Sequence, residues 1–134
     1  MKSIAHFEFE SPKIIGVLSD RNIPAHLQKR LDGLLKRRRI PYVCLPFRVE
    51  PKYLKNVIAC MRIMDIEGLI VLGDHARRLA RSMAHLTKSA KKAGFVNAIE
   101  RRKNRFHGHY IQDGRNFYSD AVGLLTSRSS KNAT

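Results

Sequence analysis

Apolar residues in the first half of the chain form short continuous runs separated by segments with a helical spacing. The continuous runs at 13–19, 42–49 and 68–72 have the length of buried strands. After the first run, leucines recur at i, i+4, i+7 and i+8, which predicts a helix with Pro24 at its first position and its end near Arg39. These leucines are Leu27, Leu31, Leu34 and Leu35.

The segment between the second and third runs also has a helical spacing. Pro51 suits a first helical position, and DIEG at 65–68 ends the segment. Its apolar residues share one side of the predicted helix: Leu54, Val57, Ile58 and Met61. Pro46, inside the second run, predicts that this strand lies at the edge of a sheet or ends there. The first half therefore has the order β-α-β-α-β.

The second half of the chain has a broken helical pattern and then two short apolar runs. The helical pattern extends from His75 to Lys92, and Gly94 suits the residue that caps a helix C-terminus. The runs at 95–99 and 106–111 flank the basic segment RRKNR, which predicts a hairpin. A last helix is expected over NFYSDAVGLL.

Strands that alternate with helices predict the α/β class, as a single domain with a parallel-rich sheet covered by helices on both faces. A chain of 134 residues can bury such a core without disulfides or a metal. The expected boundaries are 1–12 for an N-terminal extension or edge strand, 13–125 for the domain, and 126–134 for a disordered tail.

The C-terminal helix and the strand ends are the two features that bear on interactions. Ligands in open α/β sheets bind beyond the carboxyl ends of the strands, so polar residues there are candidates. The predicted helix carries more apolar side chains than a free surface helix tolerates, because large exposed apolar patches are uncommon on monomers. We expect it to fold back on its own sheet or to pack in a homodimer, with the dimer slightly favoured.

The composition of the chain departs from that of an ordinary soluble domain mainly in its positive charge. Lysine and arginine number 26 against 11 acidic residues, which gives a net charge of +15. The basic runs at 36–39, 88–92 and 101–105 fall on exposed faces and turns, and no aromatic residues interleave with them as stacking platforms. This pattern favours solvated faces over a dedicated nucleic-acid site, and it predicts nonspecific nucleic-acid binding at low salt.

The cysteines and histidines give no sign of a metal or a disulfide. Cys44 and Cys60 both lie inside apolar runs, which predicts two buried free thiols and a reducing cytoplasmic location. The histidines have no metal-ligand spacing, so we expect no metal site, and His75 is interpreted as a surface residue. No apolar run reaches the ~18 residues that cross a bilayer, so no membrane contact is expected.

Four segments carry a family resemblance: IIGVLSDRNIPAH, GLIVLGDHA, AGFVNAI and HYIQDG. With their spacing, they resemble the N-terminal substrate-binding domain of the shikimate dehydrogenases, over residues 13–125. The resemblance implies the same α/β fold and a site for a small hydroxylated carboxylate. The NADP-binding domain of the family, with its glycine-rich turn, has no counterpart in this sequence, and no G-x-G-x-x-G is present, so no cofactor is expected.

Carried over residue by residue, the resemblance leaves few of the family's functional groups. The lysine that transfers a proton to the substrate falls on Ala76, so no catalytic residue is expected. The two serines that bind the substrate carboxylate fall on Arg21 and Ile23. The family asparagine is kept as Asn97, and the aspartate that partners the lysine is kept as Asp113. The resemblance thus implies Arg21, Asn97 and Asp113 as ligand contacts.

Each of these three residues also has a local interpretation. Asn97 follows a strand and could bond nearby backbone as a turn residue. Asp113 could cap the last helix. Arg21 suits a carboxylate through its two-pronged guanidinium, and it also suits an ordinary surface position in so basic a chain.

Three functions follow from these observations. The first is a noncatalytic binding or regulatory module that keeps the old pocket for a small, shikimate-like carboxylate. The second is a basic interaction protein for nucleic acid or an acidic partner, with a vestigial pocket. The third is half of a shikimate dehydrogenase that uses a cofactor domain in trans. The alanine at position 76 argues against the third, because acid–base groups commonly contribute ~10²–10⁴ in rate.

Overall fold

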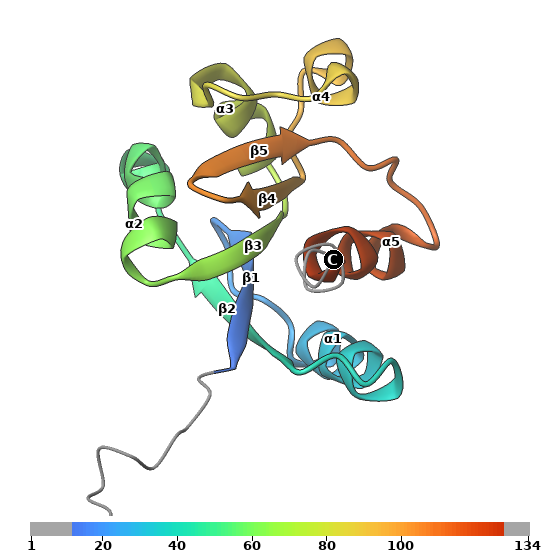
Figure 1. Ribbon diagram of the computed structural model, residues 1–134. Helices are drawn as coiled ribbons and strands as arrows, with labels where there is room; N and C mark the ends of the chain where they lie inside the picture. The colour runs from blue at the N-terminus through green and yellow to red at the C-terminus, as the bar shows by residue number, and fades with distance from the viewer. Residues whose placement is uncertain (1–11, 128–134) are drawn as a thin grey trace, which may run out of the picture.

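The computed structural model describes residues 12–127, which form strands and helices in alternation around one sheet (Figure 1). In chain order the elements are β1 (Lys13–Ser19), α1 (Ala25–Arg37), β2 (Tyr42–Arg48), the 3-10 helix η2 (Pro51–Asn56), α2 (Val57–Ile63), β3 (Ile66–Val71), α3 (His75–Ser82), α4 (Lys88–Ala93), β4 (Ala98–Arg102), β5 (Arg105–His109) and α5 (Phe117–Thr126). The predicted N-terminal extension and most of the predicted tail lie outside the described residues, and α5 ends at Thr126.

The sheet has five strands in the order β2-β1-β3-β4-β5. Strands β2, β1 and β3 pair in parallel, while β4 is antiparallel to both of its neighbours, so β5 again points in the direction of β3. This arrangement confirms the predicted α/β class and the hairpin. Pro46 lies in β2 at the sheet edge, as its missing N–H group led us to expect.

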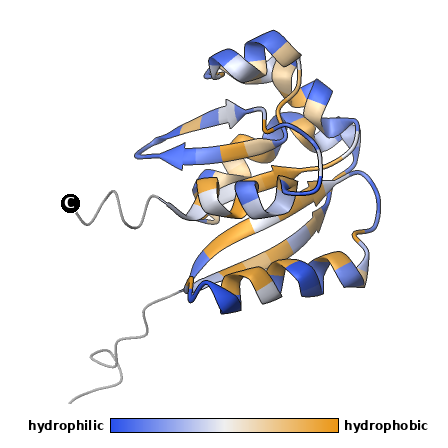
Figure 2. Ribbon diagram, turned by 90° about the vertical axis from the view of Figure 1, so that its right-hand side faces the viewer, coloured by the Kyte–Doolittle hydropathy of each residue, from blue (hydrophilic) through white to orange (hydrophobic). Residues whose placement is uncertain are grey.

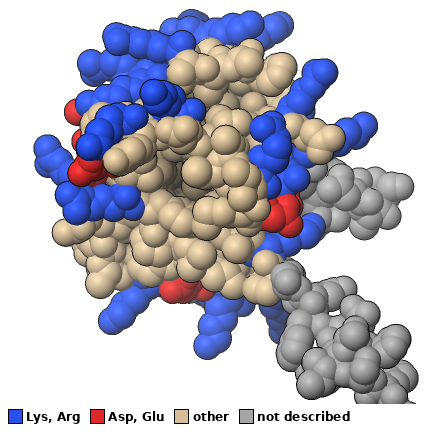
Figure 3. Space-filling view, turned by 90° about the vertical axis from the view of Figure 1, so that its left-hand side faces the viewer, with Lys and Arg blue, Asp and Glu red and all other residues tan. Residues whose placement is uncertain are grey.

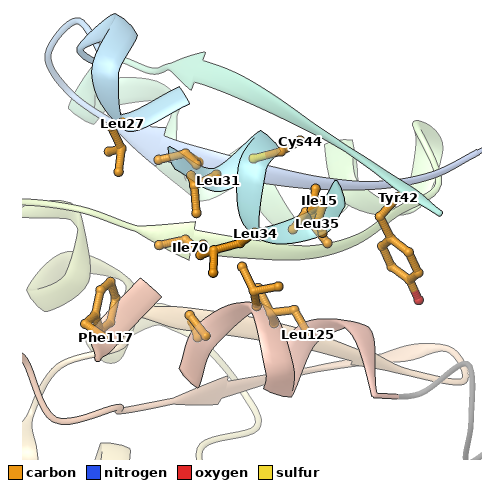
Figure 4. Packing of buried hydrophobic residues seen from close by; sticks show 14 residues of the cluster. Ile15, Leu27, Leu31, Leu34, Leu35, Tyr42, Cys44, Ile70, Phe117 and Leu125 are labelled. Atoms are coloured by element: carbon orange, nitrogen blue, oxygen red, sulfur yellow. The ribbon is translucent and has the colours of Figure 1, made fainter. Parts of the chain in front are cut away.

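Helices cover both faces of the sheet and divide the core into two clusters. On one face, α1 and α5 pack over Ile15, Val17 and Ile70 (Figure 4). On the other, η2, α2 and α3 pack over Leu18, Leu69 and other strand residues. Figure 2 shows β1 and β3 hydrophobic over most of their length and the tip of the β4–β5 hairpin hydrophilic. The buried, parallel half of the sheet thus carries the main part of the hydrophobic core.

The predicted leucine face of α1 is buried: Leu27, Leu31, Leu34 and Leu35. Helix α5 packs beside α1 and buries Phe117, Ala121 and Leu125 against the sheet. Of the two alternatives for this helix, the structure shows the fold-back. The apolar side of α5 is already covered, so the helix has no exposed apolar face for a partner. The homodimer stays a prediction.

The second half differs from the sequence pattern at its boundaries. The helical region breaks at residues 83–87, where Leu86 pairs with Gly108 on the open side of β5. Gly94 ends α4 with a φ of 73°, as expected of a C-terminal cap. Strand β4 begins three residues later than the run at 95–99, and the hairpin turn is shorter than RRKNR, with Lys103 at a positive φ of 57°. Strand pairing, rather than hydrophobicity, sets these limits.

The two cysteines have different environments. Cys44 is buried, as predicted, but the prediction for Cys60 was wrong, because Val57 and Met61 occupy the inward side of α2 and leave Cys60 exposed. Burial, with a further contribution from Asp32, raises the pKa of the Cys44 thiol to about 12. The thiolate is the reactive form, so Cys44 is protected by both burial and its pKa.

We therefore expect one of the two thiols to react in the native protein. A thiol-specific disulfide reagent at neutral pH should modify Cys60 rapidly and Cys44 only after unfolding, which mass spectrometry of the native and denatured protein would measure. Cys60→Ser is the control and should abolish the fast reaction. Rapid native modification of Cys44 would contradict the packing of α1 on β2.

Candidate ligand-binding site

A pocket of about 360 Å³ opens where β3 and β5 end and β4 begins. Its wall comes from four segments that are far apart in sequence and meet because these strand ends share one edge of the sheet. The lining residues are Val71, Leu72, Gly73, Ala76, Phe95, Asn97, Tyr110, Asp113, Phe117 and Tyr118. The position is the one that the sequence predicts for a ligand.

The turn from β3 into α3 forms one side of the pocket. Gly73 has a φ of 67°, a left-handed conformation that glycine adopts without strain. This turn starts α3 at His75 and places Ala76 in the pocket wall, where it is buried. A methyl group, which neither donates nor accepts a proton, thus stands where the resemblance implies a lysine.

His75 is fully buried, so its interpretation as a surface residue was wrong. Its Nε2 lies 2.6 Å from the Val49 carbonyl, and its Nδ1 lies 3.1 Å from Nη1 of Arg78. A carbonyl only accepts and a guanidinium only donates, so the ring hydrogen is on Nε2. His75 connects the end of β2 to the start of α3. The partner carbonyl is 26 residues away, which a sequence pattern does not indicate.

Asn97 links the strand end to the loop after β5. Its Nδ2 donates to the Ile111 carbonyl at 2.7 Å, and its Oδ1 accepts from the Ile111 N–H at 2.8 Å. Its own backbone pairs with Val71 and His109. The local interpretation of Asn97 therefore has a structural basis. The primary amide has a second N–H and a second lone pair, so the same side chain retains capacity toward the pocket that it lines.

The structure brings Asn97 and Asp113 to the same pocket and leaves Arg21 outside its wall. Asp113 is exposed and does not cap α5, whose N-cap is Asn116. Arg21 is also exposed, and its backbone N–H donates to the Ser19 hydroxyl at 3.1 Å. Both lie at the strand-end edge of the sheet, but only Asp113 reaches the pocket.

Aromatic rings form the part of the wall that the sequence analysis did not identify. The Phe95 and Tyr110 ring centroids are 6.4 Å apart, and those of Phe117 and Tyr118 are 5.0 Å apart. The four rings come from three separate loops and helix starts, so no spacing in the sequence groups them. The usable signal was position, since each ring lies within a few residues of a strand end or helix start.

Two arginines stack against these rings at the border of the pocket. The guanidinium carbon of Arg77 lies 5.7 Å from the Phe95 ring centroid, and that of Arg30 lies 5.3 Å from the Tyr118 centroid. Burial raises the pKa of Tyr118, Arg30 opposes this, and Asp113 adds to it. Tyr118 therefore stays a phenol at neutral pH and can donate a hydrogen bond.

A buried carboxylate stabilises the hairpin behind the pocket. Glu100 in β4 is fully buried, and its Oε1 accepts hydrogen bonds from His109 Nε2 and Arg102 Nε, each at 2.9 Å. Burial opposes ionisation of Glu100, but the hydrogen bonds from His109 and Arg102, together with their positive charge, outweigh it and lower the pKa below the ordinary 4.5.

This lowered pKa makes Glu100 an acid-sensitive element. Ionised Glu100, together with His109 and Arg102, stabilises the fold at pH values above the unfolded-state pKa of Glu100, which is near 4.5. This stabilisation is lost as the pH falls through the lower pKa that Glu100 has in the folded state. We expect Glu100→Gln to cost about 2 kcal/mol at neutral pH and progressively less in acid. Urea unfolding of both proteins across this pH range measures the difference. A difference that stays constant down to about pH 3 would contradict the assignment.

The described part of the chain contains no group of three or more His, Cys, Asp or Glu side chains that could hold a metal ion. None of its helices combines the length and the hydropathy required to cross a bilayer.

The fold and the pocket define an open-sheet α/β domain with a pocket at its strand ends, where the ligands of such sheets bind. No family model matches the chain. It is 30% identical over 101 residues to the shikimate dehydrogenase (NADP(+)) of Dehalococcoides mccartyi strain BAV1, an alignment that covers 75% of this chain and 34% of that enzyme. The chain spans about a third of the length of the curated relatives that it matches.

Solved structures give the same result for the fold. Shikimate dehydrogenase 1 of Peptoclostridium difficile superposes with a TM-score of 0.70 at 17% identity, over 86% of this chain and 43% of that one. Shikimate 5-dehydrogenase of Listeria monocytogenes, solved with shikimate and NAD, gives a TM-score of 0.66 at 24% identity, over 91% and 39%. The chain is thus shikimate dehydrogenase-like and is similar to the N-terminal part of these enzymes.

Proposed function

We propose that the strand-end pocket binds a small cyclic carboxylate of the shikimate type, and that the chain acts as a binding or regulatory module without dehydrogenase activity of its own. One observation carries the proposal: the pocket brings Asn97 and Asp113 together with the methyl group of Ala76. Asn97 and Asp113, which would hold hydroxyl groups of the ligand, are retained. The lysine that would transfer a proton is replaced by Ala76, whose methyl group cannot transfer one.

The chemistry of the wall suits a ring with hydroxyl groups and one negative charge. Asp113 accepts hydrogen bonds from hydroxyl groups, and Asn97 can donate or accept one. The rings of Phe95 and Tyr118 offer apolar faces to the ring of the ligand, and the arginines stacked on them favour an anion at the border. A volume of about 360 Å³ lies within the usual range for small-molecule pockets.

Two arginines are candidates for the contact with the carboxylate of the ligand. The resemblance implies Arg21, while the pocket geometry favours Arg77, because Arg77 stacks on a lining residue. Arg30 also stacks on a lining ring, but its Nη2 already donates to the Arg115 carbonyl at 3.4 Å. We assign the carboxylate to Arg77. Isothermal calorimetry with shikimate would test this assignment: Arg77→Ala should weaken binding about tenfold, and Arg21→Ala and the remote Lys91→Ala should leave it unchanged.

Calorimetry on the wild-type protein, together with an NADP-dependent oxidation assay, tests the binding proposal directly. Wild-type protein should bind shikimate saturably and should show no NADP-dependent oxidation of it above a buffer blank. Absence of binding to shikimate and quinate alike would overturn the proposal. Turnover that Asp113→Ala abolishes would instead make the chain a working part of an enzyme.

The scattered charge predicts a different behaviour toward nucleic acid. On the face shown in Figure 3, lysines and arginines surround an uncharged area and do not line one groove. We expect duplex DNA to bind weakly, without sequence preference, and to be released between ~50 and ~200 mM salt, because counterion release drives such binding. Fluorescence anisotropy with two unrelated duplexes measures this. A sequence-selective complex that survives the higher salt would favour the nucleic-acid alternative.

A further inference from the structure

A second and larger pocket lies on the opposite side of the sheet from α1 and α5. It has a volume of about 590 Å³ and is bounded by β1, β2 and β3 below and by η2 and α2 above. We call it the η2–α2 groove; its lining residues are Leu18, Phe47, Arg48, Val49, Glu50, Tyr53, Asn56, Val57, Cys60, Met61, Met64, Ile66 and Leu69. The strand-end pocket shares none of these residues.

The groove exists because α2 is short. Its seven residues cover the centre of the sheet and leave the apolar side chains of the edge strand β2 partly uncovered, with Phe47 half-buried. The floor is fully buried, as at Leu18 and Met61, whereas Tyr53 and Met64 at the mouth are 55% and 51% exposed. An apolar floor with an apolar, open mouth is typical of a surface that receives another apolar group.

The charge at the mouth selects the partner. Arg48 lines the groove at the end of β2, and its guanidinium makes no hydrogen bond or ion pair with any residue that the structure describes. The one acidic lining residue, Glu50, is paired with Lys52 at 3.6 Å. Figure 3 shows this face, where a continuous uncharged area with a hollow is bordered mainly by lysines and arginines, with a few acidic side chains among them. The free charge at the groove is positive.

We propose that the η2–α2 groove binds an amphiphilic carboxylate, with its flexible apolar tail on the groove floor and its carboxylate on Arg48. Methionine thioethers at Met61 and Met64 adapt to a flexible chain better than branched side chains do. A second copy of the chain fits less well, because it would bring a further net charge of +15 against the same cationic border.

The absence of tryptophan from the sequence allows a specific reporter. Tyr53→Trp puts a single tryptophan at the exposed mouth of the groove, where the substitution does not disturb the core. Decanoate, kept below its micelle concentration, should shift the emission to the blue and saturate. Decanol should bind more weakly, and decyltrimethylammonium, which carries the opposite charge, should bind weakest.

Two variants make the test specific. Arg48→Gln in the Tyr53→Trp background should lower decanoate affinity about tenfold and leave decanol affinity unchanged, since a lost charged contact is worth about one power of ten. Phe95→Trp places the same reporter in the strand-end pocket and should not respond. Circular dichroism checks that each variant is folded.

Several outcomes would overturn the proposal. Equal responses to decanoate and decyltrimethylammonium would show that the carboxylate is not recognised. A response of Phe95→Trp alone would show that decanoate does not bind in the η2–α2 groove. A blue shift with anionic phospholipid vesicles and none with free decanoate would assign the groove to a membrane surface. A shift that depends on protein concentration, with a dimer in light scattering, would assign it to a second copy.

Discussion

Asn97→Ala is expected to lower the free energy of unfolding by about 2 kcal/mol and to abolish measurable binding of shikimate. The Asn97 amide makes two hydrogen bonds to the backbone of Ile111, and alanine leaves both of those groups without their partner. The loop that carries Asp113 into the pocket follows directly after Ile111, so its position depends on the same two bonds.

The control is Asp113→Asn, at an exposed residue that caps no helix. It should change stability by less than about 0.5 kcal/mol while weakening shikimate binding, because only the ligand contact is altered. Urea denaturation and calorimetry on both variants measure the two quantities. If Asn97→Ala unfolds at the wild-type urea concentration, the amide does not hold the loop, and the structural part of the explanation is wrong.

Leu125→Ala is expected to destabilise the protein by about 3 kcal/mol, since a buried leucine is removed from the contact between α5 and the sheet. Gly68 in β3 allows this close approach, because a Cβ at that position would lie 2.8 Å from Leu125 Cδ2. Gly68→Ala alone should therefore cost about 1–3 kcal/mol through overpacking. In the double variant the new methyl group has more room, so the combined loss should be less than additive.

The exposed Ile63→Ala is the matched apolar control and should change stability by less than about 0.5 kcal/mol. Thermal unfolding at several protein concentrations completes the experiment. The melting temperature should be independent of concentration, as expected when α5 is covered by its own sheet. A melting temperature that rises with concentration, and that Leu125→Ala makes constant, would instead support the homodimer.

The parallel half of the fold was predictable because hydrophobic periodicity directly reflects burial on one helix face or in one strand. The leucines of α1 and the position of Pro46 at an edge are examples. The strand-end rule also brought Asn97 and Asp113 to one pocket, because strand ends meet whatever the side chains are. Neither inference needed a contact between distant residues.

The remaining features depend on such contacts. His75 is buried because the Val49 carbonyl and Arg78 satisfy its two ring nitrogens, and neither partner is marked in the sequence. The side of α2 that faces inward is set by the sheet beneath it, so an apolar run did not reveal that Cys60 is exposed. The aromatic wall of the pocket forms only when separate loops converge.

Chemical-shift mapping by nuclear magnetic resonance tests the central proposal most directly. Titration of isotope-labelled protein with shikimate to about 10 mM should give saturable shifts at Gly73, Ala76 and Tyr118, and at the side-chain amide of Asn97, with an apparent Kd of about 1 mM or tighter. Shifts that do not saturate, or that are scattered over exposed lysines and arginines, would contradict a ligand site at the strand ends.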